Sequence, residues 1–349
     1  MTLSPDTRED KVQAVHDDAP TPANRSRRIT ARPLELVERF GLVLLLGGIV
    51  LFFCLWSRTS DVFPTVANAR NIAANESVLV IAALAALIPL VAERFDLSVG
   101  AVVATTSIAT AKMATEWELP LALAIVGGVL VGTAIGLVNG FLIAYFNANS
   151  LVITLGMSTL LAGIGVLWAG YQTLLGVPRP LLDFGNLSWS GIPRPVWLLA
   201  VTALVVAFML GFTLFGRRLL AIGSNESASR LVGMPVARTI MLAFACSGAV
   251  AGVAGVLLLA RTGSAAAGVG AGYTLPALAA IFLGSTTIRP GRFTVPGTLV
   301  GVFFIAVSIN GLTLAGAQDW VEPVFNGAAV VLAVSAAAVI AKKRRRGAR

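Results

Sequence analysis

The residues whose types and spacing could do the most defined chemistry lie in one stretch, FGRRLLAIGSNESASRLVGMP, at residues 215–235. Ser224 is suited to begin a helix, because its hydroxyl can accept a hydrogen bond from a free backbone N–H of the first turn. Glu226 falls in that turn, where the helix dipole favours a negative charge. Arg230 follows four residues later, in the order that stabilises a helix by an ion pair. This chemistry is capping and charge pairing on a short helix rather than catalysis.

The same stretch carries stop signals. Gly233 suits the left-handed position after a helix, and Pro235 cannot continue one. The pattern therefore predicts a helix over about 225–232. A helix of this length is marginal in water by itself, so we expect a surface to pack on it, and a cytosolic partner is one candidate. The alternative is a solvated loop that contains a little helix.

Catalytic and metal chemistry has little support elsewhere in the sequence. The one histidine, His16, lies in a polar stretch near the start, while Cys54 and Cys246 lie in apolar runs. Cysteines in such runs are typical of small buried side chains. No segment fits G-x-x-x-x-G-K-[ST], the loop that cradles the phosphates of ATP. We therefore predict that this chain is not an enzyme and holds no metal or cofactor of its own.

The composition indicates a membrane protein. Of 349 residues, 56% are hydrophobic and 12% are charged, and the mean hydropathy is +0.85. Soluble domains carry about 25% charged residues. The net charge of +9 is gathered at the chain ends and in short loops, which is the pattern of charges that orient a chain in a membrane rather than bind nucleic acid.

Apolar runs of about 14–27 residues follow one another along the chain, and a membrane-spanning helix needs roughly 20. We predict an all-α polytopic membrane protein with about ten transmembrane helices, of which the third and eighth are short or interrupted. The ten runs cover residues 39–56, 72–92, 97–114, 120–146, 150–170, 196–215, 239–260, 275–288, 294–315 and 321–341.

The basic residues predict the orientation of these helices. With both termini inside the cell, 20 of the 26 Lys and Arg residues lie on the cytoplasmic side, as the positive-inside rule requires. We accordingly expect a disordered cytosolic tail over 1–36, a transmembrane domain over 37–341 with a cytoplasmic loop at 216–238, and a basic cytosolic tail over 342–349. The last of these could contact anionic lipid, although an orientation signal is the simpler role.

Glycines at a spacing of four residues mark packing faces. Residues four apart lie on one side of a helix, and a row of glycines lets a neighbouring helix approach closely. We therefore expect tight helix packing, rather than a solute path, at Gly128, Gly132, Gly136 and Gly140, and at the pairs Gly248/Gly252 and Gly297/Gly301.

The 215–235 stretch also resembles the cytoplasmic loop of permease subunits from ABC importers of the ribose, xylose and galactose type, which use a binding protein. Their pattern is close to F-G-R-x-x-x-A-I-G-x-N-x-x-A-A-R-x-x-G. This chain differs at Ser229, where that family usually has Ala. It keeps Phe215, Gly216, Arg217, Ala221, Ile222, Gly223, Asn225, Ala228, Arg230 and Gly233.

Further segments carry the same resemblance in order over residues 65–340. FDLSVG resembles the family's I-D-L-S-V-G, and SLVITLGMSTLLAGIGVL its V-T-L-G-M-x-T run. The first of these segments supplies Asp96, Leu97, Ser98 and Gly100. The departures are Glu93 and Arg94 in place of Gly-Gly, Thr274 in place of Glu, and Pro276 in place of Asp or Asn.

The resemblance implies a transporter subunit that pairs with a second copy of itself in the inner membrane of a prokaryote. A separate ATP-binding subunit would use ATP and magnesium on the inside, and an extracytoplasmic binding protein would deliver a monosaccharide on the outside. The loop would transmit the movement of the ATPase through Arg217, Gly223, Asn225, Glu226, Ala228, Arg230 and Gly233.

A neutral sugar requires hydrogen-bonding groups along its path rather than buried charges. Polar side chains on or near the predicted spans could supply them, although each could instead bond a neighbouring helix. These candidates are Asn75, Asn139, Thr154, Ser158 and Asn310. Asp96 could likewise serve the path or coupling, or simply cap the third span.

Other functions stay open at this point. The solute could be a nucleoside, an autoinducer-like polyol, a branched-chain amino acid or another small polar molecule. An ion-coupled carrier would need ionisable residues in the middle of its spans, but Glu76 is expected near the outer end of the second run. A membrane enzyme would need a cluster of reactive side chains, and the lone histidine argues against one.

Overall fold

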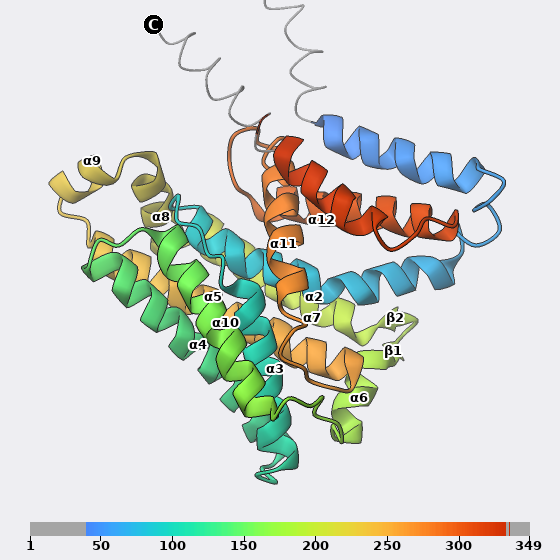
Figure 1. The fold of residues 1–349 in the computed structure, drawn as a ribbon. Helices are drawn as coiled ribbons and strands as arrows, with labels where there is room; N and C mark the ends of the chain where they lie inside the picture. The colour runs from blue at the N-terminus through green and yellow to red at the C-terminus, as the bar shows by residue number, and fades with distance from the viewer. Residues whose placement is uncertain (1–39, 333–334, 336–349) are drawn as a thin grey trace, which may run out of the picture.

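Helices make up most of the computed structural model, which describes residues 40–332 and residue 335 (Figure 1). In chain order the elements are helix Phe40–Leu55, α2 (Val66–Leu90), α3 (Val99–Thr115), α4 (Leu121–Tyr145), α5 (Ser150–Ala169), α6 (Arg179–Asn186), β1 (Ser188–Trp189), β2 (Ile192–Pro193), α7 (Arg194–Phe212), α8 (Leu214–Ser224), α9 (Glu226–Leu231), α10 (Val236–Thr262), α11 (Ala271–Gly284), α12 (Val295–Leu314) and helix Val321–Leu332. The two strands form one antiparallel hairpin.

Each of the ten predicted apolar runs coincides with a helix in the described part of the chain. Six helices, namely α2, α4, α5, α7, α10 and α12, are long and apolar enough to cross a membrane. The other four are shorter, so the count of ten spans and the orientation stay predictions. Both predicted tails, His16 and the end of the tenth run lie outside the described residues.

Helices α2 and α10 occupy the centre of the molecule. In each of these two helices, 72% of the most apolar stretch of 18 residues is buried, whereas the corresponding share is 22% in α4, α5 and α7. The outer helices therefore present apolar side chains to their surroundings, as helices in contact with lipid do.

Helix α3 is short, and protein surrounds most of it. It has 17 residues, and its Thr105, Thr106 and Thr110 hydroxyls each donate to a carbonyl one turn earlier. Side chains of this kind satisfy themselves within the helix. Their polarity lowers the hydropathy of the third run, which is one of the two weakest of the ten runs in the sequence.

The glycine row of α4 packs closely against another helix, as its spacing predicted, and that helix is α10. A Cβ on Gly136 would lie 3.1 Å from the Gly248 Cα, and one on Gly252 would lie 2.9 Å from the Val129 Cα. Contacts this close leave no room for a side chain. Gly297 and Gly301 of α12 face α11 in the same way.

The two ends of the molecule carry different loops. Helices α8 and α9 stand at one end, and α6 with the β1–β2 hairpin stands at the other (Figure 1). Between them runs α7 with 19 residues, which is about 28 Å of helix. At the hairpin end the Arg194 guanidinium lies 5.1 Å from the centre of the Trp189 ring.

Candidate functional site

The 213–235 segment contains two helices, whereas the sequence pattern predicted one. The first, α8, begins after Thr213, whose hydroxyl accepts from the Gly216 N–H at 3.3 Å. Its buried residues Gly216, Leu219 and Ile222 recur every three residues, a spacing that could have identified the helix in the sequence. The apolar run 196–215 conceals this helix in the sequence, because the run continues past the end of α7 into the first residues of α8.

The second helix, α9, begins one residue later than predicted. Its cap is Asn225, whose Oδ1 accepts from the Ala228 N–H at 2.9 Å. The predicted cap Ser224 was wrong, because its hydroxyl donates instead to the Leu220 carbonyl at the end of α8. The Ser229 hydroxyl donates to the Asn225 carbonyl, so this departure from the family pattern has a local partner.

Glu226 is the most connected side chain of α9. One carboxylate oxygen lies 2.7 Å from an Arg230 nitrogen, as predicted for residues four apart. The other forms an ion pair with Arg94, which belongs to the turn between α2 and α3. Glu226 and Arg94 are 28% and 26% exposed, so water only partly screens the pair. Gly233, with φ at +77°, ends the segment as predicted.

The other face of the segment is open. Leu231 is 89% exposed and Val232 is 72% exposed, although both are large apolar side chains. Of the residues that the resemblance assigns to coupling, Arg217, Asn225, Ala228, Arg230 and Gly233 are exposed, while Gly223 and Glu226 are half-buried. The segment thus has an outward side and an inward side.

Gly223 is the second inward contact of the segment. A Cβ at this position would lie 3.3 Å from the Ala92 Cα, so α8 rests directly on the backbone that follows α2. Glycine is required here because of this close approach.

The turn between α2 and α3 has an unusual backbone. Glu93 has φ at +57°, the left-handed region that glycine adopts without cost. The glycines of the family pattern at 93 and 94 fit this conformation. Here the turn is closed by the Arg94 N–H, which donates to the Pro89 carbonyl at 3.1 Å.

Asp96 is buried in the segment that follows, with 3% of its surface exposed. Its Oδ1 accepts from the Ser98 N–H at 3.0 Å and from the Ser98 hydroxyl at 2.6 Å. Its Oδ2 accepts from the Ser247 hydroxyl of α10 at 3.0 Å. Burial raises the pKa of the Asp96 carboxyl, and these hydrogen bonds partly offset the rise. Asp96 therefore shapes the start of α3 and also ties it to α10.

Polar side chains from other helices hold the chain between Arg94 and the first turn of α3. The Leu97 N–H donates to Thr154 of α5 at 3.0 Å, and the Gly100 N–H donates to Thr274 of α11 at 3.1 Å. Asn139 of α4 donates to the Ser98 hydroxyl at 2.9 Å. Thr274 thus has a defined contact where the family pattern has Glu, and the neighbouring departure, Pro276, lies inside α11.

The proposed path residues do not come together. Asn139 and Thr154 meet at the Asp96 segment, as described. Asn75 accepts from Arg261, and Asn310 accepts from Asn68 at 3.0 Å between α12 and α2. Asn139 and Thr154 therefore bond the segment before α3, while Asn75 and Asn310 bond neighbouring helices. The Ser158 hydroxyl makes no hydrogen bond within the described part of the chain.

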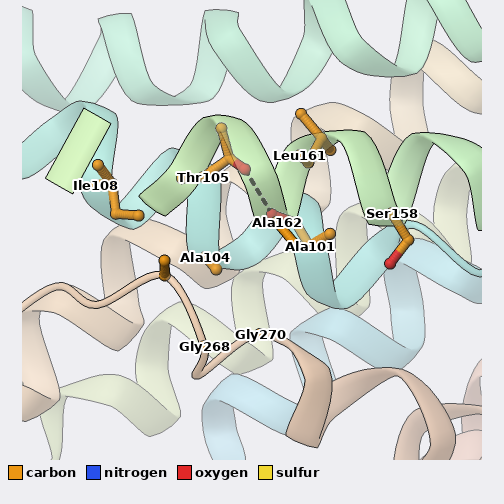
Figure 2. A pocket seen from close by; sticks show the side chains of 11 residues that line it. Ala101, Ala104, Thr105, Ile108, Ser158, Leu161, Ala162, Gly268 and Gly270 are labelled. Carbon is orange, nitrogen blue, oxygen red and sulfur yellow. Dashed lines mark hydrogen bonds between the residues drawn. The ribbon is translucent and has the colours of Figure 1, made fainter. Parts of the chain in front are cut away.

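Ser158 instead lines a cavity of about 100 Å³ between α3, α5 and the loop before α11 (Figure 2). The Thr105 hydroxyl also borders it but donates to the Ala101 carbonyl at 2.8 Å. The lining has no charged side chain and consists of Ala101, Ala104, Thr105, Ile108, Ser158, Leu161, Ala162, Gly165, Ala267, Gly268 and Gly270. Small-molecule sites usually measure about 300–1,000 Å³, so the cavity is too small for a sugar.

Glu76 lies deeper in its helix than the sequence suggested. Helix α2 begins at Val66 rather than at residue 72, because the polar stretch before 72 continues the helix. Glu76 is half-buried and interacts electrostatically with Glu322 and Tyr273. Among the described residues, no three His, Cys, Asp or Glu side chains gather closely enough to hold a metal ion.

The apolar helices define the chain as a multi-pass membrane protein. Residues 68–334 match the family described as "Branched-chain amino acid transport system / permease component". Since the match covers more than half of the chain, the protein belongs to this family of transporter permeases.

Three curated relatives are named as permease proteins for sugars. The chain is 32% identical to the L-arabinose ABC transporter permease protein AraH of Azospirillum brasilense, over 86% of this chain and 87% of that protein. It is 30% identical to the D-allose transport system permease protein AlsC of Escherichia coli (87% and 93%). It is also 30% identical to the ribose import permease protein RbsC of the same species (86% and 93%). These relatives confirm the resemblance to sugar ABC permeases, and no solved structure matches the chain.

Proposed function

We propose that this chain is the transmembrane permease subunit of an ATP-driven importer and forms the path of a monosaccharide across the membrane. The observation that carries the proposal is the two-sided 213–235 segment. Its outward side exposes Leu231 and Val232, and its inward side joins the α2–α3 turn through Glu226. A large apolar pair that stays exposed outside the membrane is typical of a protein interface.

The partner on this outward side is proposed to be the ATP-binding subunit. The chain has no phosphate-cradling loop, so ATP and magnesium would bind to that subunit. This assignment sets α8 and α9 on the cytoplasmic side of the inner membrane of a prokaryote, with both termini inside.

The proposed solute is neutral. The cavity beside Ser158 has no charged side chain in its lining, and burying the charges of an amino acid without partners is costly. A polyol needs only hydrogen bonds. Relatives named for arabinose, allose and ribose support a monosaccharide, while a relative named for autoinducer 2 keeps another small polar solute as an alternative.

The remaining partners are proposed for the other faces. The binding protein would dock at the end that carries α6 and the hairpin. A second copy of the chain would pack on α5, where a side chain added at Gly156 or Gly163 would meet nothing within 4 Å. Lipid would cover the exposed apolar surface of the outer helices.

Uptake into proteoliposomes tests this function. Vesicles that contain the chain together with its co-purified partners should accumulate labelled pentose or hexose only with ATP inside and binding protein outside. Accumulation driven by a proton or sodium gradient without ATP would overturn the proposal. That result would favour an ion-coupled carrier, for which half-buried Glu76 would be the carboxylate to examine.

A further inference from the structure

The α8–α9 pair is joined to the rest of the molecule by more than its chain connections to α7 and α10. Gly223 rests on the backbone after α2, and Glu226 forms an ion pair with Arg94. Both contacts are made to the same short turn, residues 91–94. A movement of α9 therefore has a second route into the protein besides the ends of the flanking helices.

The two ion pairs of Glu226 differ in what they connect. Arg230 lies on α9 itself, so that pair moves with the helix and transmits nothing. Arg94 lies 132 residues away from Glu226 in the sequence. Its side chain is also the more enclosed of the two arginines, at 26% exposed against 51% for Arg230.

The turn that carries Arg94 is attached firmly to α3. The Arg94 N–H is bonded to Pro89 on one side, and two residues later Asp96 is fixed by three hydrogen bonds. The Phe95 ring stacks on Phe282 of α11, with 6.0 Å between ring centres. A shift of Arg94 would therefore displace the beginning of α3 rather than be absorbed by a loose loop.

Helix α3 forms one wall of the cavity. Its residues Ala101, Ala104, Thr105 and Ile108 face Ser158 and Leu161 of α5 across the space (Figure 2). The cavity is too small for a sugar, so one of its walls has to move for a solute to pass. The connection runs from Glu226 through its ion pair with Arg94, along the backbone to Asp96, and through the Asp96–Ser98 hydrogen bonds to the start of α3.

We propose that Arg94 is a positioning residue that transmits the movement of α9 to α3 and thereby sets the opening of the cavity beside Ser158. The proposal rests on the proposed function, in which a partner moves α9. It is specific to this chain, because the family pattern has glycine where Arg94 stands. The ion pair would add a link that a glycine turn lacks.

The reactivity of a cysteine in the cavity tests the proposal. Ser158→Cys is introduced into the chain with Cys54→Ala and Cys246→Ala, and its rate of modification by a small thiol reagent is measured in detergent. Arg94→Gln and Glu226→Gln should each change this rate by about two- to fivefold, the range that an ion pair of this exposure supports. The double variant should change it no more than either single variant, because one interaction is lost in all three.

Arg218→Gln is the matched control, because it removes an exposed arginine of α8 that forms no ion pair within the described residues, and it should leave the rate unchanged. Equal rates in wild type and Arg94→Gln, or additive effects in the double variant, would overturn the proposal. Thermal unfolding of each variant identifies any that is misfolded. Arg94→Lys keeps the charge and should restore most of the wild-type rate, which a general loss of packing would not allow.

A second measurement separates this proposal from the proposed function. In the assembled complex, Arg94→Gln should keep its ATPase partner but transport less solute for each ATP hydrolysed. If no ATPase accompanies even the wild-type chain, the proposed function fails. The cysteine reactivity of the isolated chain would still decide the role of Arg94.

Discussion

Asp96 and Ser247 lie 151 residues apart in the sequence, and the Ser247 hydroxyl donates a hydrogen bond of 3.0 Å to the Asp96 carboxylate. This contact joins the start of α3 to the central helix α10. The segment between Arg94 and α3 has few internal backbone hydrogen bonds. Its conformation therefore depends on side chains supplied by α4, α5, α10 and α11.

The first prediction concerns the hydrogen bonds of Asp96. Asp96→Ala removes the acceptor for Ser98 and Ser247 and should lower the free energy of unfolding by about 1–3 kcal/mol. Asp96→Asn keeps one acceptor and offers a donor to Ser247, so it should lower the free energy of unfolding by less than Asp96→Ala does. Thermal unfolding in detergent measures both. Equal losses for the two variants would show that the charge, rather than the hydrogen bonds, holds the segment.

The second prediction is a pH dependence. Because burial raises the folded-state pKa of Asp96 above its ordinary value of 3.8, the folded chain holds this proton more tightly than the unfolded chain. The contribution of Asp96 to stability is therefore fully present below pH 3.8 and is lost as the pH rises through the folded-state value. The midpoint of thermal unfolding should fall less over this rise in Asp96→Asn than in wild type. A parallel fall in both proteins would contradict the assignment to Asp96.

The third prediction tests the glycine face between α4 and α10. Gly136→Ala sets a methyl group against the Phe244 and Gly248 backbones and should destabilise the protein by about 1–3 kcal/mol. Gly211→Ala is the control, since its Cβ would meet nothing within 4 Å. That variant should be neutral or slightly stabilising, because alanine favours a helix more than glycine does. Similar unfolding temperatures for both variants would argue against close packing.

The fourth prediction concerns the cavity beside Ser158. Ala162→Leu adds bulk to the cavity from an exposed position of α5, so the fold should tolerate it. Uptake should fall about tenfold or more, equivalent to about 1.4 kcal/mol, while ATPase co-purification stays unchanged. Ala134→Leu adds the same bulk to an exposed position of α4 and should not alter uptake. Unchanged uptake in Ala162→Leu would remove the cavity from the path.

Short sequence patterns predicted many local features of the fold. The glycine spacing in α4 and in α10 predicted a closely packed face on each helix, since spacing along one helix determines which face packs, but it did not name the partner helix. The Glu226–Arg230 pair and the end at Gly233 followed from rules that involve only a few residues. The same rules named the wrong cap, because Ser224 and Asn225 are both good caps and the end of α8 decided between them.

Contacts between distant residues could not be predicted. Nothing in the sequence near Arg94 indicates that Glu226 is its partner, because the pair forms only when α9 folds back onto the α2–α3 turn. The candidate path residues show the same limit. Asn139 and Thr154 share one segment, whereas Asn75 and Asn310 bind elsewhere, and polarity within a helix does not reveal which neighbour it faces.

Binding of an ATPase to the outward side of α9 is central to the proposed function, and purification with its partners tests it most directly. The tagged chain is isolated in mild detergent as wild type, Leu231→Asp and the control Val62→Asp, whose side chain is exposed at 49% in a different loop. Mass spectrometry should find an ATP-binding subunit with wild type and with Val62→Asp. Leu231→Asp should recover about tenfold less of this subunit, because the variant loses an apolar side chain that the interface would bury. Equal recovery with all three folded proteins would contradict docking at α9.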